Sequence, residues 1–145
     1  MELSIKPIYL LDTNIISEFT KLSPNQKLLE NVSKHEELCS ICSTVWEEAV
    51  YGYERMPEGK KKNHLGEYIQ NLKESYEILP YDSFASQICG ELRARCEKDG
   101  TPVPYCNSQI AATAIANNMI LITHNIADFA PLVKNSMLKV EDWWV

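Results

Sequence analysis

Short apolar runs alternate along the chain with segments in which apolar residues recur every three or four positions. The runs predict strands at residues 7–11, 38–42, 77–80 and 119–123, and residues 139–140 are a candidate for a short last strand. The helical spacing predicts helices at residues 15–19, from Pro24, at 43–55, 60–76 and 82–100, and from Asn107. Strands that alternate with helices are typical of a parallel sheet covered on both sides. The sequence therefore predicts a single α/β domain over residues 1–145.

Individual residues predict where these helices begin and end. The residues expected at helix starts, as caps or in the first position, are Pro24, Ser43, Thr44 and Asp82. Gly100 is expected to end the helix that Asp82 begins. Thr101–Cys106 contains two prolines and is predicted as a loop, so Asn107 is expected to open the next helix.

Composition restricts the class of protein. Hydrophobic residues make up 45% and charged residues 23% of the chain, as in ordinary globular domains. No apolar run approaches the roughly 20 residues needed to cross a bilayer, and the N-terminus lacks the pattern of a signal peptide, so we expect a cytoplasmic protein without a membrane segment. The net charge of −6 argues against a passive nucleic-acid binder, but not against a nuclease that uses a metal ion.

The chain has an odd number of cysteines, five, which argues against a disulfide framework in the cytoplasm. Cys39 and Cys42 form a C-x-x-C pair, but no second pair or nearby histidine completes a tetrahedral zinc site. We therefore expect the cysteines to be small buried hydrophobes.

Polar residues follow the predicted strands. Asp12, Thr13 and Asn14 end the first strand, and Glu47 and Glu48 lie one turn beyond the second. Asn107 opens a helix, and the fourth strand ends at residues 123–128. Carboxyl ends of parallel strands meet at one edge, where ligands bind. Carboxylates gathered there repel one another unless a cation such as Mg²⁺ or Mn²⁺ lies between them. Each residue alone also fits a helix cap, a solvated face or an Asx turn.

Four ordered segments resemble the motifs of PIN domains, in particular VapC toxins of bacterial toxin–antitoxin pairs. They are Tyr9–Asn14, Thr44–Gly52, Gly100–Ala112 and Leu121–Phe129. In the second motif of that family a glutamate stands four residues before a glycine, which selects Glu48 over Glu47. The resemblance covers nearly the whole chain and implies a three-layer α/β/α sandwich around a mostly parallel sheet of four to five strands.

The resemblance also implies a function. It indicates a Mg²⁺-dependent endoribonuclease, with Mn²⁺ as an alternative ion, that cuts transfer RNA or another structured RNA. Its expected partners are a VapB-type antitoxin and a second copy of the chain. The implied metal-binding and catalytic residues are Asp12, Glu48, Asn107 and Asp128, with one or two metal ions. The implied substrate and supporting residues are Thr13, Asn14, Thr123 and Asn125. Lys60–Lys62 either begins a solvated helix or steers RNA to the site.

Asn107 departs from the family pattern, which has an aspartate at this position. An amide oxygen can contact a cation but brings no charge, and Mg²⁺ depends on carboxylates, so we expect weakened metal binding and low or absent activity. The asparagine is compatible with a naturally degenerate copy and with an engineered change that spares the host cell. The alternative function is a catalytically dead PIN module that only binds its antitoxin or RNA. A phosphotransfer domain is disfavoured, because Asn14 stands where dehalogenase-type phosphatases carry a second aspartate.

Overall fold

The computed structural model describes residues 6–145 and is built on five strands. They are β1 (Tyr9–Leu11), β2 (Cys39–Cys42), β3 (Ile78–Leu79), β4 (Ile120–Ile122) and β5 (Lys139–Glu141). The strands form one sheet in the order β3-β2-β1-β4-β5, and every neighbouring pair is parallel. This confirms the predicted α/β class with a parallel sheet, and all five predicted strands are present.

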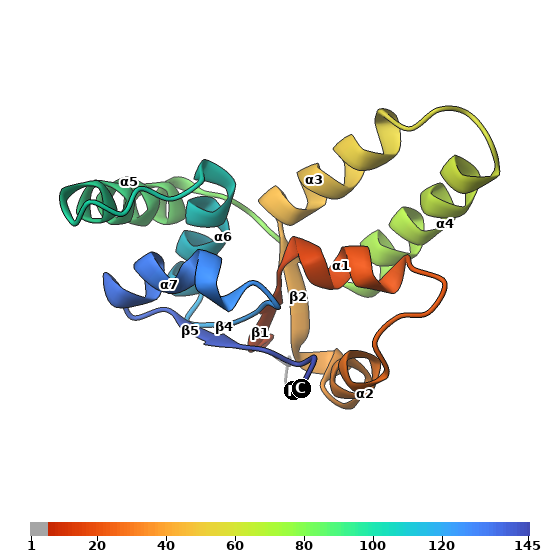
Figure 1. Ribbon diagram of the computed structural model, residues 1–145, viewed down its shortest axis with the longest axis horizontal. Coiled ribbons are helices and arrows are strands. Elements are labelled where there is room, and N and C mark those ends of the chain that lie inside the picture. The colour runs from red at the N-terminus through yellow and green to blue at the C-terminus, as the bar shows by residue number, and fades with distance from the viewer. Residues whose placement is uncertain (1–5) are drawn as a thin grey trace, which may run out of the picture.

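Helices lie on both sides of this sheet. They are α1 (Thr13–Phe19), α2 (Gln26–Lys34), α3 (Ser43–Glu54), α4 (Lys60–Ser75), α5 (Ser83–Lys98), α6 (Tyr105–Ala116) and α7 (Ile126–Lys134), with a 3-10 turn at Glu36–Leu38. In Figure 1, α5, α6 and α7 lie on one side of β1 and β2, and α1, α2 and α4 lie on the other. The arrangement is the predicted three-layer sandwich.

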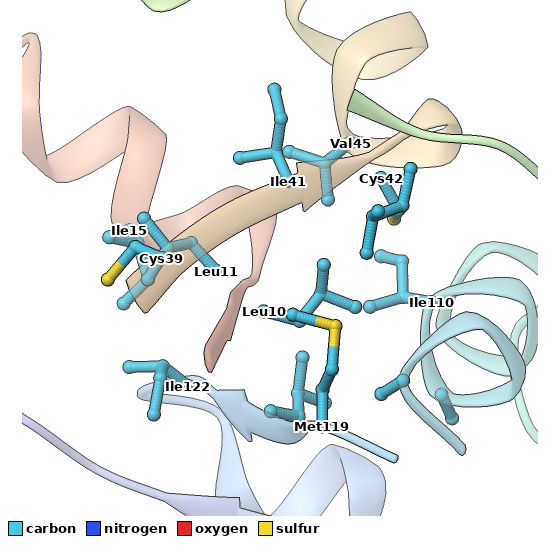
Figure 2. Packing of buried hydrophobic residues seen from close by; sticks show 14 of the residues in the cluster. Leu10, Leu11, Ile15, Cys39, Ile41, Cys42, Val45, Ile110, Met119 and Ile122 are labelled. Atoms are coloured by element: carbon cyan, nitrogen blue, oxygen red, sulfur yellow. The ribbon is translucent and has the colours of Figure 1, made fainter. Parts of the chain in front are cut away.

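The central strand β1 supplies side chains to both layers of the core. Successive side chains of a strand point to opposite faces of a sheet, and both Leu10 and Leu11 are fully buried. Figure 2 shows Leu10 beside Ile110 and Met119, and Leu11 beside Ile15. The two leucines therefore fix the strand from both sides, and the residue that follows them, Asp12, is held firmly at the edge of the sheet.

Some of the predicted helix boundaries are confirmed and others are wrong. The Asp82 side chain caps α5, and Gly100 follows the helix with φ +75°, where a residue without a side chain is favoured. Pro24 does not begin α2, because Asn25 is its N-cap and accepts a hydrogen bond from the Leu28 backbone N–H. The predicted start was two residues early, since proline and asparagine both suit helix starts.

Ser43 and Thr44 are also not caps, although their sequence position suggested it. They are the first residues of α3, and their hydroxyl groups bond elsewhere. The Ser43 hydroxyl donates to the Leu79 carbonyl at 3.2 Å, and the Thr44 hydroxyl donates to Gln109 Oε1 at 3.1 Å. These two bonds tie α3 to β3 and to α6, which brings the N-terminal half of α6 against α3.

Two further differences concern the third and fourth motifs. Helix α6 begins at Tyr105, two residues before the expected start, so Asn107 lies inside the first turn. Residues 126–134 form α7, which the sequence did not predict because Pro131 interrupts its pattern. Burial of Phe129 and Leu132 against the core holds this helix despite the proline.

The cysteines follow the prediction with one exception. Cys39, Cys42, Cys89 and Cys96 are buried, whereas Cys106 is exposed. Burial raises the pKa of the Cys39 thiol to about 12 and that of Cys42 to about 11, so neither is a reactive thiolate near neutral pH.

Of the three lysines that begin α4, Lys62 is not part of a solvated face. Its ammonium group pairs with Glu58 at 3.1 Å and lies over the Tyr53 ring. Only the other two lysines of the cluster remain free to steer an anion. Within residues 6–145 no helix is long and apolar enough to cross a bilayer.

Candidate active site

Asp12 occupies the end of the central strand and begins α1. Its backbone N–H donates to the Ile122 carbonyl of β4, and its Oδ1 accepts the Thr13 backbone N–H at 2.7 Å. The Thr123 hydroxyl donates to Oδ2 at 2.8 Å. Both carboxylate oxygens are therefore held by hydrogen bonds, and the side chain is buried, with only 5% of the residue exposed.

Thr123 connects the ends of β1 and β4. Besides donating to Asp12, its Oγ1 accepts the Asn14 side-chain amide and the Asn125 backbone N–H, each at 3.0 Å. It is fully buried. The contact follows from topology, because β4 is the parallel neighbour of β1 and Leu11 is in register with Ile122, so the residues after both strands meet. Thr123 fixes the orientation of Asp12 and Asn14 together.

Glu48 reaches the same edge from α3. The Thr13 hydroxyl donates to Glu48 Oε1 at 3.0 Å, which links the helix after β2 to the residue after Asp12. Its neighbour Glu47 is exposed to solvent. The geometry thus distinguishes the two glutamates, and Glu48 is the one that faces Asp12.

The electrostatics of this pair show a surplus of negative charge. Burial raises the pKa of Asp12, and the charge of Asp128 raises it further, against the hydrogen bonds from Thr123 and Thr13. Burial likewise raises the pKa of Glu48, and the charges of Asp12 and Glu47 add to the shift, against the bond from Thr13. The ionised forms are therefore disfavoured, and a cation between them would relieve the cost.

Asn107 and Asp128 lie near this set without a side-chain hydrogen bond to it. Asn107 is half-buried in the first turn of α6, next to Cys106, whose thiol pKa is raised by burial and by the charges of Glu48 and Glu47. That turn therefore lies near Glu48. Asp128 is exposed in the first turn of α7, and its charge reaches Asp12. The hydrogen bonds thus connect Asp12, Thr13, Asn14, Glu48, Thr123 and Asn125, while Asn107 and Asp128 lie around this set.

The chemistry of these side chains suits a hard divalent cation. They offer carboxylate, amide and hydroxyl oxygens, and Mg²⁺ binds through one or two carboxylates together with waters and substrate phosphates. In the described part of the chain no three His, Cys, Asp or Glu side chains are close enough to hold a metal ion by themselves. A cation here would therefore also need the Asn107 amide oxygen, water or phosphate.

The family of the chain follows from comparison with known proteins. The PIN-domain model matches residues 9–130, a range that begins with β1 and includes Asp12, Glu48, Asn107 and Asp128. This chain belongs to the PIN-domain family. The resemblance that the four motifs predicted is confirmed.

Within the PIN family, the chain is similar to proteins named as VapC ribonucleases and toxins. The chain is 30% identical over 125 residues to the VapC ribonuclease Y4jK of Sinorhizobium fredii, covering 82% of this chain and 88% of that protein. It is 29% identical over 137 residues to the tRNA(fMet)-specific endonuclease VapC of Shigella flexneri, covering 93% and 97%. The solved structure of VapBC2 from Rickettsia felis, bound to a DNA fragment from their promoter, contains a chain 28% identical, with a TM-score of 0.81 over 94% and 98%.

One polar cluster beside this PIN site was missed by the sequence analysis. His124 pairs with Asp142 and stacks on Trp144, next to Asn14. The sequence assigned no role to His124, Asp142 or Trp144. The predicted last strand held the signal, because a parallel β5 beside β4 brings the residues after Glu141 to the residues after Ile122.

A pH dependence of stability follows from the raised pKa of Asp12. The folded state binds this proton more tightly than the unfolded chain, so the free energy of unfolding rises as pH falls through the raised pKa, and the gain is complete below the usual value of about 3.8. Asp12→Asn, which removes the charge but keeps a side-chain acceptor, is expected to raise the Tm near neutral pH by about 3–5 °C for each kcal/mol relieved.

Thermal unfolding of both forms across the acid range, in the presence of a chelator, measures this effect. The advantage of Asp12→Asn should shrink as the wild-type aspartate becomes protonated. A difference in Tm that stays constant with pH, or a variant less stable near neutral pH, would show that the buried charge is not what limits stability.

Proposed function

We propose that this chain is the toxin of a VapBC-type pair, a cytoplasmic Mg²⁺-dependent endoribonuclease whose activity is weakened or abolished by Asn107. The observation that supports this most strongly is the fixed pair Asp12 and Glu48. Two carboxylates with raised pKa are held at the edge of the sheet by Thr123 and Thr13. The names of the relatives, ribonuclease and endonuclease, point to the same reaction.

Asp12, Glu48 and position 107 would hold the metal ion, with Asp128 at its side. When bound, such an ion activates a water molecule and neutralises charge on the phosphate oxygens of RNA. Thr123 holds the Asp12 carboxylate by a hydrogen bond, and Asn14 in turn positions Thr123. Thr13 holds Glu48, so neither carboxylate has to be reoriented before it acts.

A groove leads away from this pair and suits the antitoxin. It has a volume of about 590 Å³ and runs between α1, α3 and α4, from Thr13 and Glu48 to Met56 and Pro57. Its mixed polar and apolar lining fits an extended peptide that ends at the carboxylates. The VapBC2 structure of Rickettsia felis contains toxin and antitoxin together. We propose a VapB-type antitoxin as the partner that covers the site, and a homodimer as the state of the toxin.

Asn107 favours a second candidate, a catalytically dead module that binds the antitoxin or RNA. With an amide at this position the site lacks one of the four expected acidic side chains. The two candidates differ in one measurable respect. A dead module stays inactive when the aspartate is restored, whereas a disabled nuclease regains cleavage.

The two adjacent glutamates of α3 provide a matched test of the proposed nuclease. In an Asn107→Asp background, Glu48→Gln is expected to lower the rate of RNA cleavage by about 100-fold or more, because it removes one of the negative charges that would hold the metal ion beside the reacting phosphate. Glu47→Gln changes the net charge by the same amount on the exposed side of the helix and is expected to leave the rate within about twofold. Cleavage of bacterial transfer RNA in Mg²⁺, with chelator as the blank, measures both.

Equal losses in the two variants would mean that only the overall charge of α3 matters. Full activity of Glu48→Gln would exclude Glu48 from the site. Either result counts against the proposed metal-dependent reaction.

A further inference from the structure

A stacked pair of aromatic rings lies at the open edge beside the carboxylates. The rings of His124 and Trp144 are 4.4 Å apart at an angle of 20°. Asp142 holds both, because its carboxylate lies 3.1 Å from His124 Nδ1 and accepts the Trp144 backbone N–H at 2.9 Å. The pair is therefore fixed, yet 51% of the His124 side chain remains exposed to solvent.

This pair is directly connected to the proposed catalytic residues. The His124 backbone N–H donates to Asn14 Oδ1 at 3.4 Å, and the Asn14 amide donates to Thr123, which bonds Asp12. Only Asn14 and Thr123 therefore separate the stacked rings from the carboxylate.

A pocket opens beside the stacked rings. It has a volume of about 450 Å³, within the roughly 300–1,000 Å³ typical of small-ligand sites. Its lining includes Asn14, Ser17, Lys21, His124 and Trp144. The lining is polar apart from the two rings, and Lys21 and Glu18, which both line the pocket, form an ion pair at 2.8 Å.

We propose that this pocket takes a nucleobase of the RNA strand, next to the phosphate that reacts, and that the His124–Trp144 pair is the surface on which the base stacks. The inference rests on the proposed ribonuclease function. Unpaired RNA bases are recognised by stacking on aromatic side chains, histidine included. The face of the His124 ring away from Trp144 offers that contact, while Asn14 and Ser17 can bond the edge of a base. The pair would thus position the strand and contribute to its selection.

The test compares two strands of equal length and charge on the chain as it stands, with Asn107 in place. One is a short oligouridylate, and the other is the same ribose-phosphate strand without bases. The protein is expected to bind the oligouridylate more tightly, as measured by fluorescence anisotropy. Trp144→Ala and His124→Ala are each expected to reduce that preference by about 5- to 150-fold, which is the contribution of a base–aromatic stack. Trp144→Phe keeps a ring and should retain most of the preference.

Phe84→Ala is the matched control. Phe84 is an exposed aromatic side chain, 59%, at the start of α5, and it does not line the pocket. Its loss should leave the preference unchanged. Near-ultraviolet circular dichroism of each variant verifies that the fold is kept.

The outcomes separate this inference from the nuclease proposal. It is overturned if the wild-type chain binds both strands equally or binds neither, or if Trp144→Ala and His124→Ala weaken both strands to the same extent. Cleavage of RNA by the Asn107→Asp form would still support the nuclease in that case. Conversely, a base preference that depends on Trp144, together with an inactive Asn107→Asp form, would support the stacking surface and remove the nuclease.

Discussion

Asn107→Asp is expected to turn this chain into an active, Mg²⁺-dependent ribonuclease, with a rate at least about 100- to 1,000-fold above that of the chain as it stands. Restoring one fixed charge in such a site contributes about 3–4 kcal/mol to stabilising the transition state. Position 107 lies in the first turn of α6, near Glu48, and an aspartate there would complete the acidic set. Cleavage of total bacterial RNA, and then of purified transfer RNAs, measures the gain.

The same substitution should tighten the binding of Mg²⁺ and Mn²⁺, which calorimetric titration of both forms at equal salt measures. Asp12→Asn in the Asn107→Asp background is the control, because it preserves the shape of the site and removes the charge. A folded, metal-bound aspartate form that leaves every RNA intact would reject the nuclease and favour the binding module.

Thr123→Val is expected to have the second-largest effect, although threonine and valine have nearly the same shape. The Thr123 hydroxyl donates to Asp12 and accepts from Asn14 and Asn125, and it is fully buried. Valine leaves those partners unsatisfied, at a cost of about 2–4 kcal/mol in the free energy of unfolding. In the Asn107→Asp background it should also lower cleavage by about 10- to 100-fold, as loss of an outer partner of a metal ligand does.

Thr123→Ser separates the hydroxyl from the bulk of the side chain. It keeps the hydrogen bonds and removes one methyl group, so it should cost about 1 kcal/mol and leave most of the activity. Chemical denaturation and the RNA assay measure the two effects. If serine proves as damaging as valine, packing of the methyl group rather than the hydrogen-bond network is what Thr123 supplies.

The sequence predicted β1, β2 and β4 well because each is a short, mostly apolar run that ends at a polar residue. Leu10 and Leu11 illustrate this, since both faces of β1 are buried and both positions are leucine. The helix at Ile126–Lys134 was not predicted, because Pro131 has a very low helix propensity. Burial of Phe129 and Leu132 against the core compensates for this local cost. Propensity is local, whereas that burial depends on the rest of the fold.

In the candidate site, too, some features have a local signal in the sequence and others depend on the whole fold. That polar residues gather after the strands is readable from the chain, because parallel strands end at one edge. Which of them bond to one another depends on strand order, and neither the bond from Thr123 to Asp12 nor the one from Thr13 to Glu48 has a local signal. The pairing of Asp142 with His124 likewise depends on β5 lying beside β4.

The position of β4 beside β1 has a consequence for the order in which the site forms while the chain is being synthesised. Asp12 and Thr123 are 111 residues apart, so the bond between them closes a very long loop. Contacts of such sequence separation form late and slowly in folding. A growing chain that has not yet released residues 120–128 from the ribosome can pair β1 with β2, but it lacks β4 and the threonine that orients Asp12. The site of a toxin with this order of strands is therefore completed only when most of the chain has been made.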